Sequence, residues 1–383
     1  MSLQDLMDET GLYVGRIWRP GTGPAIVTIR ASQVMDVTCR DVPTMHDLLE
    51  REDPVAWLRA ASGEPVCTLA ELEAASLAAP DADALRLLAP CDLQAIKACG
   101  VTFARSMLER VIEERAAGDP ARAEAIRTKV AQVIGNSLRD LVPGSEQAAR
   151  VKSVLQAEDL WSQYLEVGIG PDAEVFTKAQ PMSAVGHGAE VGLHPTSKWN
   201  NPEPEIVLAC NSRGQILGAT LGNDVNLRDI EGRSALLLGK AKDNNAAAAI
   251  GPFIRLFDDG FSLDDVRQAD LSMRVEGRDG FVLTGHSSMS EISRDPADLA
   301  AQTCGTHHQY PDGFLLYLGT MFAPIEDRGA KGAGFTHHEG DIVTISTPGL
   351  GALVNHVTLS TKAPPWAFGT AALMRNLAAR GLI

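Results

Sequence analysis

The chain has 383 residues, 45% hydrophobic and 22% charged, a composition typical of a globular protein with one large or two modest domains. Its 34 basic and 49 acidic side chains give a net charge of −15, which disfavours nucleic acid and anionic membranes as partners because basic patches bind both. No apolar run reaches the roughly 18 residues that span a membrane, and the polar residues 1–10 do not resemble a secretory signal. The six cysteines form no C-x-x-C pair, so we expect reduced thiols in a cytoplasmic protein.

The first 90 residues are expected to form a small N-terminal α/β domain. Residues 11–18 and 25–29 have the pattern of strands, and residues 45–51, 55–61 and 69–78 have the pattern of helices. This part has no cluster of catalytic residue types, so a capping or dimer-supporting role is the simplest interpretation. Residues 88–90 mark the boundary to a second domain, residues 91–383.

A helical region is predicted for about residues 103–160. Phe103, Met107 and Val111 recur at helical spacing, and the charges on the opposite face are most simply a solvated surface. A break at residues 142–145 precedes a further helix, which Ser145 could cap. The region could be a lid that excludes water or a surface insertion.

Two candidate acid–base groups lie in the stretch that follows. Gly186 and Gly188 flank His187 and allow close approach of a ligand to the backbone. His187 or Glu190 could transfer a proton, although a lone histidine in a glycine-rich loop is more often structural.

Residues 202–224 are predicted to form a hairpin that gathers three carboxylates. Glu203 and Glu205 open an apolar strand, where side chains two residues apart point to the same face. Residues 211–214 form a turn, and residues 215–221 have the pattern of the returning strand. A turn centred on Ser212 and Arg213 would place Glu205 opposite Thr220. Asp224 then returns to the end that carries the glutamates.

Three carboxylates at one end of a sheet repel one another, and a hard divalent cation with oxygen ligands would relieve that repulsion. The absence of cysteine and histidine from the trio disfavours zinc. The alternative is an acidic pair at the start of a strand, with Asp224 as a turn or cap residue.

Beyond residue 252, short apolar runs alternate with turns at residues 271–276, 281–284, 314–319, 341–346 and 352–356. This pattern predicts a mainly β domain with interleaved helices. The pairs His307-His308 and His337-His338 look like tandem metal ligands, but neighbouring residues on a strand point in opposite directions, so neither pair is expected to share an ion.

Three spaced motifs resemble the fumarylacetoacetate hydrolase superfamily. They are the E-x-E of Glu203 and Glu205, the N-D-V-x-x-R-D of residues 223–229, and Lys242 followed nine and ten residues later by Gly-Pro. The resemblance implies a mainly β fold with helices (α+β), with a mixed β-roll catalytic domain. It also implies Mg²⁺, or Mn²⁺, bound by Glu203, Glu205 and Asp224, with Lys242 beside the substrate.

The resemblance also suggests residues on the substrate side of the site. Lys178 matches the lysine of an F-x-K motif that supports the substrate loops. Thr320 matches a threonine that contacts the substrate carboxylate, and Gly340-Asp341 matches a Gly-Asp pair with a structural role. Asn223 and Arg228, within the N-D-V-x-x-R-D motif, are further candidates for substrate binding.

One departure from the pattern bears on the reaction. Hydrolases of the superfamily carry G-x-N-Y-x-x-H-x-x-E, and here Gly100 is followed by Ser106 at the histidine position and Glu109 at the glutamate position. A serine without a base cannot readily take a proton from water, which puts hydrolysis in doubt.

Longer segments, residues 161–167, 197–205, 222–245 and 309–328, look like the long 2-keto-3-deoxypentonate dehydratases of this superfamily. That resemblance implies a cytoplasmic hydro-lyase that converts this small 2-keto acid to 2,5-dioxopentanoate in pentose catabolism, as a homodimer or homotetramer. An acylpyruvate-type C–C hydrolase, an aldolase acting on the same substrate, and a binding protein on a retired fold are the alternatives.

A set of roles follows as a hypothesis. Lys242 would act near C3 or the enolate oxygen, where burial and the nearby Mg²⁺ could lower its pKa enough for base work. The alternative is that Lys242 is a charge partner for the three carboxylates. Glu109 or Glu190 would protonate the departing hydroxyl, while Thr320 and Ser106 would orient the substrate.

Overall fold

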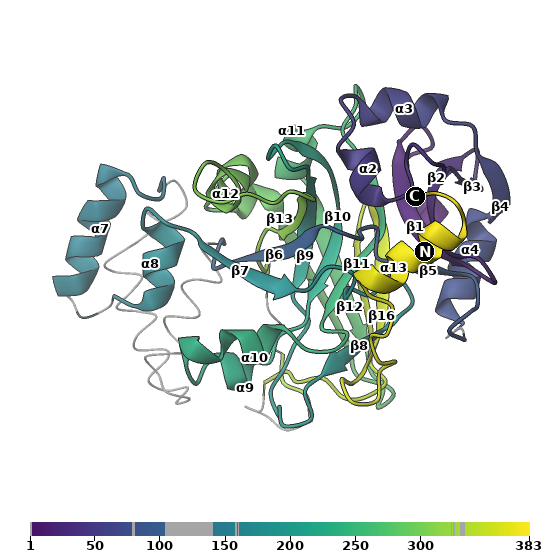
Figure 1. Ribbon diagram of the computed structural model, residues 1–383. Helices are drawn as coiled ribbons and strands as arrows, with labels where there is room; N and C mark the ends of the chain where they lie inside the picture. Colours follow the sequence, from purple (N-terminus) through teal and green to yellow (C-terminus); the bar gives the residue numbers. More distant parts are fainter. Residues whose placement is uncertain are drawn as a thin grey trace.

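The computed structural model describes residues 2–78, 81–103, 141–157, 159, 161–322, 324, 326–329 and 334–383. Two β-sheets form the centre of this part of the chain, and helices lie around their edges (Figure 1). Most of the predicted helical region, including Ser106 and Glu109, lies outside the described residues. None of the helices in the described ranges is both long and apolar enough to cross a bilayer.

The larger sheet has the strand order β4-β3-β2-β1-β11-β10-β9-β14-β6-β7, with β5 paired to β1. Its strands are β1 (Tyr13–Arg19), β2 (Gly23–Arg30), β3 (Gln33–Asp36), β4 (Glu64–Thr68), β5 (Arg86–Leu88), β6 (Ala95–Gly100), β7 (Glu174–Ala179), β9 (Pro204–Cys210), β10 (Ile216–Asp224), β11 (Ala248–Leu256) and β14 (Phe314–Tyr317). The central strands β9 and β11 are buried along their whole length, which explains their continuous apolar runs.

The smaller sheet has the order β13-β12-β15-β16-β8. Its strands are β8 (Glu190–Leu193), β12 (Asp270–Glu276), β13 (Val282–Ser288), β15 (Ile342–Thr347) and β16 (Gly351–Leu359). Burial alternates along β12, and its inward residues Leu271, Met273 and Val275 share a core cluster with Ile206 and Leu208 of β9. Apolar side chains between the two sheets therefore hold the sheets together.

The described helices are mostly short. They are α1 (Leu3–Leu6), α2 (Met45–Leu49), α3 (Pro54–Ala60), α4 (Leu69–Leu77), α7 (Glu146–Ala157), α8 (Gln163–Ile169), α9 (Arg228–Glu231), α10 (Leu238–Lys242), α11 (Leu263–Arg267), α12 (Pro296–Thr303) and α13 (Thr370–Ala379), with 3₁₀ turns η1 (Ala235–Leu237) and η2 (Met289–Glu291). Reciprocal capping fixes several starts, as at α4, where Thr68 and Glu71 each bond the other's backbone N–H. The predicted helices of the first 90 residues are confirmed, as are the strands predicted beyond residue 252.

The sheet and the core are continuous across residue 90. Strand β1 pairs antiparallel with β11, and Val14 and Ile26 belong to the same core cluster as Val207 and Ile250. The predicted fold class, mainly β with helices (α+β), is confirmed by the two sheets. A domain boundary near residue 90 stays a prediction.

The predicted hairpin is confirmed, but its predicted register is wrong. Glu205 lies opposite Gly222, whereas Thr220 lies opposite Val207. The turn is one residue longer than assumed, because Asn211 N–H bonds the Gln215 carbonyl, and a bulge between Ile216 and Gly218 shifts the pairing once more.

Candidate metal centre

Three carboxylates converge at the open end of the β9–β10 hairpin. Glu203 precedes β9, Glu205 lies within it, and Asp224 ends β10. The Asp224 backbone N–H donates to the Glu203 carbonyl at 3.0 Å, so these two residues face each other directly. One oxygen from each carboxylate lies within 4.8 Å of the others, and all three side chains are buried.

Two buried lysines contact this cluster. Lys242 Nζ lies 2.5 Å from Glu203 Oε2 and 3.0 Å from Asp224 Oδ2. Lys178 Nζ forms an ion pair with Asp224 Oδ1 at 2.8 Å and donates to the carbonyls of Val225 and Lys242 at 3.2 and 2.5 Å. Lys178 thus supports the backbone on which Asp224 and Lys242 lie.

Glu205 is held by neutral groups. Its Oε2 accepts the Gly319 N–H at 2.7 Å, and its Oε1 lies 3.4 Å from Thr320 Oγ1. Burial raises the pKa of Glu205 well above its ordinary value, and the charges of Asp224 and Glu203 raise it further, while Lys242 partly offsets them.

The donor set fits a hard divalent cation. The three carboxylates lie close together, and among the described residues Lys242 contacts Glu203 and Asp224, and Lys178 contacts Asp224, whereas Glu205 is bound by the neutral groups of Gly319 and Thr320. Across the described ranges, this is the one group of acidic, histidine or cysteine side chains close enough to hold a metal. Oxygen-only ligands suit Mg²⁺, Mn²⁺ or Ca²⁺.

The electrostatics of Lys242 depend on the carboxylates around it. Burial alone would lower its pKa, but the carboxylates of Asp224, Glu203 and Glu231 outweigh burial and raise that pKa above its ordinary value when no metal is bound. The predicted lowering of its pKa concerns the lysine beside Mg²⁺, and it stays a prediction. Burial lowers the pKa of Lys178, and Asp224 only partly opposes this.

Asn223 and Arg228, predicted to bind substrate, lie beside the cluster. Asn223 is fully buried, and its Oδ1 accepts the Glu203 N–H at 3.3 Å, so it stabilises the hairpin. The Arg228 guanidinium stacks over the Trp199 ring, 4.5 Å from its centroid. Substrate binding by these two residues, as by Thr320, stays a prediction.

His187 and Glu190 contact the smaller sheet instead of the carboxylates. His187 is buried, and its Nδ1 lies 2.8 Å from the Ala352 carbonyl of β16. Burial lowers the pKa of His187 to about 4. Glu190 is exposed at the start of β8, opposite His356 of β16. These contacts favour the structural interpretation of His187.

Sequence reasoning identified Lys178 on β7 but missed Glu174. Lys178 contacts Asp224, and the Lys242 Nζ lies 5.7 Å from the centroid of the Phe176 ring. The pairing of β7 with β6 is regular between Phe176 and Glu174, and alternate residues of a strand share a face, so Glu174 lies on the side of β7 that carries Phe176. Burial raises the pKa of Cys99, and the carboxylates of Glu205 and then Glu174 add to it, so both lie within electrostatic range of that thiol. The alternation E-x-F-x-K was the signal that could have identified Glu174.

Asn226 is a second residue that the sequence did not single out. Its Nδ2 donates to Glu203 Oε1 at 2.9 Å and to Glu231 Oε2 at 2.6 Å. It thereby orients the carboxylate of a candidate ligand from the side opposite Lys242, which takes the other oxygen.

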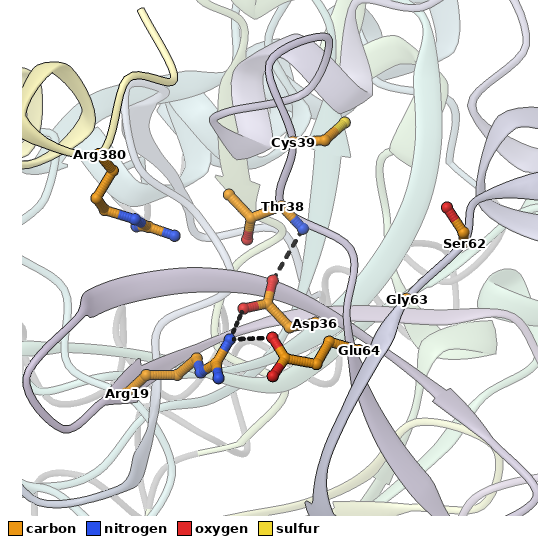
Figure 2. A pocket seen from close by; sticks show the side chains of 8 residues that line it. All are labelled: Arg19, Asp36, Thr38, Cys39, Ser62, Gly63, Glu64 and Arg380. Carbon is orange, nitrogen blue, oxygen red and sulfur yellow. Dashed lines mark hydrogen bonds and ion pairs between the residues drawn. The ribbon is translucent and has the colours of Figure 1, made fainter.

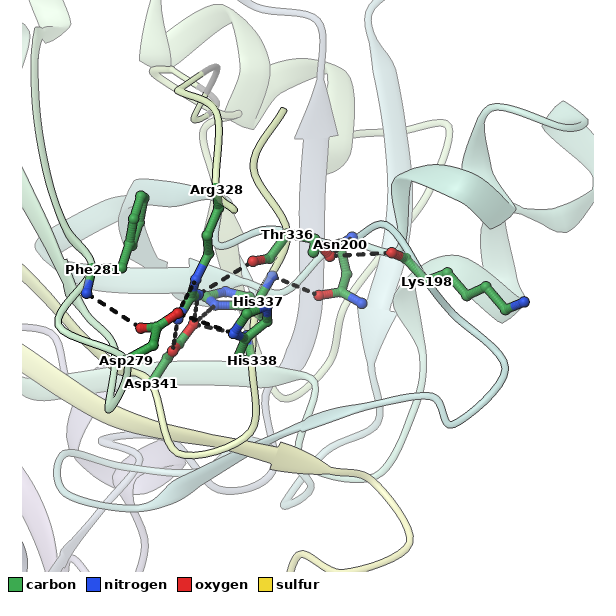
Figure 3. A network of polar contacts seen from close by, with 9 residues as sticks. All are labelled: Lys198, Asn200, Asp279, Phe281, Arg328, Thr336, His337, His338 and Asp341. Atoms are coloured by element: carbon green, nitrogen blue, oxygen red, sulfur yellow. Dashed lines mark hydrogen bonds and ion pairs between the residues drawn. The ribbon is translucent and has the colours of Figure 1, made fainter. Parts of the chain in front are cut away.

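A buried ion network anchors the segment that follows Thr320 (Figure 3). Arg328 forms paired bonds with Asp341 at 2.6 and 2.8 Å and with Asp279 at 2.9 and 3.1 Å. His337 Nδ1 lies 3.1 Å from Asp341, and His338 Nδ1 lies 3.2 Å from Asp279. The two histidines thus contact different carboxylates, and the contacts of Asp341 fit the structural role predicted for it.

The same network also contacts the stretch of backbone that precedes the candidate metal ligands Glu203 and Glu205. His337 N–H donates to Asn200 Oδ1, and Asn200 N–H donates to Thr336 Oγ1, both at 3.3 Å. Figure 3 shows Asn200 beside His337 and Thr336. Asn200 lies three residues before Glu203 in the sequence, so this network and the carboxylate cluster are joined by a short stretch of backbone.

A separate polar hollow lies on the N-terminal part of the large sheet (Figure 2). Arg19 forms ion pairs there with Asp36 at 2.5 Å and Glu64 at 3.1 Å, so its charge is compensated within the protein. The lining residues are Arg19, Asp36, Thr38, Cys39, Ser62, Gly63, Glu64 and Arg380.

The protein has an α+β fold of two sheets and a buried cluster of three carboxylates. These features define its class, a protein suited to binding a divalent metal. Residues 157–358, more than half of the chain, match the family described as fumarylacetoacetate (FAA) hydrolase C-terminal. The chain belongs to this family, and the predicted resemblance is confirmed.

Two curated relatives and one solved structure narrow the comparison. The chain is 34% identical over 215 residues to a probable 2-keto-3-deoxyxylonate dehydratase of Haloferax volcanii, covering 56% of this chain and 68% of that protein. It is 32% identical over 184 residues to a 2-dehydro-3-deoxy-D-arabinonate dehydratase of Saccharolobus solfataricus, covering 48% of this chain and 58% of that protein. A solved 2-keto-3-deoxy-D-arabinonate dehydratase, complexed with magnesium and 2,5-dioxopentanoate, shares the fold. Its TM-score is 0.62 at 20% identity, covering 91% of this chain and 99% of that chain.

Proposed function

We propose that the protein is a Mg²⁺-dependent hydro-lyase that removes the C4 hydroxyl of 2-keto-3-deoxypentonate to give 2,5-dioxopentanoate. The observation that carries the proposal is the buried cluster of Glu203, Glu205 and Asp224, close enough together to hold one ion, in a chain similar to two named pentonate dehydratases. A neighbour of the same fold is complexed with magnesium and 2,5-dioxopentanoate.

Glu203, Glu205 and Asp224 would hold the metal. Bound Mg²⁺ would supply positive charge that polarises a 2-keto group and favours loss of a C3 proton. Lys242 keeps two of the ligands oriented through its short contacts to Glu203 and Asp224. Without metal the carboxylates raise its pKa, but the positive charge of bound Mg²⁺ would oppose them, so Lys242 would accept the C3 proton as a free amine while a separate carboxyl group protonates the C4 hydroxyl that leaves as water.

Proton transfer to the departing C4 hydroxyl needs a carboxyl group beside the cluster. Glu174 is the candidate that the fold favours, because β7 presents it on the face that also carries Phe176, whose ring lies near the Lys242 ammonium. Glu109, outside the described residues, and Glu190, exposed on β8, are the candidates from sequence. Thr320, which contacts Glu205, would meet the substrate carboxylate.

A proton NMR time course of the purified protein with Mg²⁺ and D-2-keto-3-deoxypentonate tests the reaction, with a chelator as control. We expect the aldehyde signal of 2,5-dioxopentanoate, abolished by chelator. Pyruvate and glycolaldehyde would instead identify an aldolase, and an unchanged substrate, with the L-isomer also unchanged, would overturn the dehydratase proposal.

We also propose a cytoplasmic role in oxidative pentose catabolism, as a homodimer or homotetramer with the domain boundary near residue 90. Light scattering after size exclusion tests the oligomeric state, and limited proteolysis tests the boundary.

A further inference from the structure

The peptide unit between Leu318 and Gly319 links a candidate metal ligand to a residue far away in the sequence. On one side, the Gly319 N–H donates to Glu205 Oε2 at 2.7 Å. On the other side, the Leu318 carbonyl accepts the Thr102 hydroxyl at 2.6 Å. The N–H and C=O of a trans peptide point in opposite directions, so Thr102 and Glu205 bind the same planar unit from its two ends.

Thr102 is itself fixed. It is 1% exposed, and its carbonyl accepts both the backbone N–H and the hydroxyl of Ser293 at 2.7 Å. The hydroxyl therefore has a defined position from which to donate, because the backbone on which it lies is held by two hydrogen bonds.

Gly319 makes this arrangement possible. Its φ is +101°, a conformation that side chains rarely adopt, and a Cβ at this position would lie 2.0 Å from Thr102 Oγ1. Glycine permits the close approach of Thr102, but it leaves the peptide plane with little resistance to rotation. The hydroxyl bond to Leu318 is then the contact that sets the direction of the Gly319 N–H.

We propose that Thr102 is a positioning residue for the metal site: its hydroxyl fixes the Leu318–Gly319 peptide, which in turn fixes the carboxylate of Glu205. The inference rests on the proposal that Glu205 binds the metal. Glu205 is the member of the cluster that contacts neither lysine, so its orientation depends on the N–H of Gly319 and the hydroxyl of Thr320. Groups that orient metal ligands typically change metal affinity by about 10-fold to 100-fold when they are removed.

The test measures Mg²⁺ binding by calorimetry, without substrate, for the full chain and four variants. Thr102→Val removes the hydroxyl at nearly constant volume, Thr102→Ser retains it, and Thr102→Ala serves if the valine variant does not fold. The matched control is Thr303→Val, because Thr303 is also buried and its hydroxyl donates to the Leu299 carbonyl at 2.8 Å within α12.

We expect Thr102→Val, or Thr102→Ala, to raise the Kd for Mg²⁺ about tenfold, with Thr102→Ser and Thr303→Val within about twofold of wild type. Deuterium exchange of the Gly319 amide, measured without metal, should quicken in Thr102→Val and not in Thr303→Val. Unchanged Mg²⁺ affinity in Thr102→Val, or an equal loss in Thr102→Ser, would overturn the inference. If the wild-type protein bound no Mg²⁺, the proposal of a metal site would be overturned instead. Deuterium exchange of the Gly319 amide would then still test whether the Thr102 hydroxyl fixes the Leu318–Gly319 peptide.

Discussion

Lys242 offers the sharpest test of the electrostatics of the cluster. Replacing it by methionine removes the ammonium that lies 2.5 Å from Glu203 and 3.0 Å from Asp224, at a position 3% exposed. Removing one partner of a buried ion pair costs about 3 to 5 kcal/mol, because the remaining charge is left uncompensated. Three carboxylates would then face Lys178 alone. We expect Lys242→Met to lose turnover and to lower the free energy of unfolding, in chelator, by about that amount.

The same variant should still bind Mg²⁺, because all three carboxylates remain. The more negative cluster should gain at least as much stability from saturating Mg²⁺ as the wild-type protein does. Urea unfolding with chelator and with Mg²⁺ measures both quantities. Lys240→Met is the matched control, because Lys240 lies in the same helix, is exposed, and forms no ion pair with another described residue. Equal unfolding free energies for the two variants in chelator, or full activity in Lys242→Met, would refute the reasoning.

Three further predictions follow from the titrating groups. Because the pKa of His187 falls from 6.5 to about 4 on folding, the unfolded chain takes up the proton first as the pH drops. The resulting loss of unfolding free energy should reach roughly 3 kcal/mol between about pH 7 and pH 4. The variant His187→Asn keeps a donor to the Ala352 carbonyl, and urea unfolding should show a smaller loss for it over the same pH range. An equal dependence of unfolding free energy on pH in both proteins would contradict the lowered pKa of His187. The raised pKa of Glu205 predicts that Mg²⁺ binding releases a proton from this carboxyl group, so affinity should rise with pH as Glu205 ionises. Calorimetry in buffers of different ionisation enthalpy should detect the released proton, and a pH-independent affinity without proton release would count against the shift. Glu203→Gln should weaken Mg²⁺ binding at least about tenfold, and unchanged affinity would remove Glu203 from the ligand set.

The candidate ligands could be found from sequence because their signals are local. An acidic pair at i and i+2 shares a face of any strand, and Asp224 follows one hairpin later, so convergence did not depend on the details of the turn. The register did depend on them. One extra turn residue and a bulge near Gly218 moved Glu205 from Thr220 to Gly222, and neither feature has a clear sequence signature.

Contacts between distant segments could not be predicted from one sequence. The pairing of β1 with β11 joins residues near position 14 to residues near 254. Such a pairing has no local signal in the sequence, so the continuity of the sheet across residue 90 could not be seen there. The bond from Thr102 to Leu318 spans 216 positions. The raised pKa of Lys242 in the absence of metal was not evident for the same reason, since the direction of that shift depends on how many carboxylates surround the ammonium group.

The charge balance of the cluster argues for a ligand rather than a purely structural role. If the cluster only stabilised the fold, an amide or an apolar side chain at position 205 would serve better, since replacing buried charges by well-packed neutral groups is often neutral or stabilising. Instead Glu205 is buried against two other carboxylates, with hydrogen bonds from Gly319 and Thr320 and no lysine contact. The rigid, fully buried strands β9 and β11 can hold this unfavourable arrangement. A divalent cation would add positive charge among these carboxylates, so the repulsion in the empty cluster and its affinity for metal would have the same physical cause.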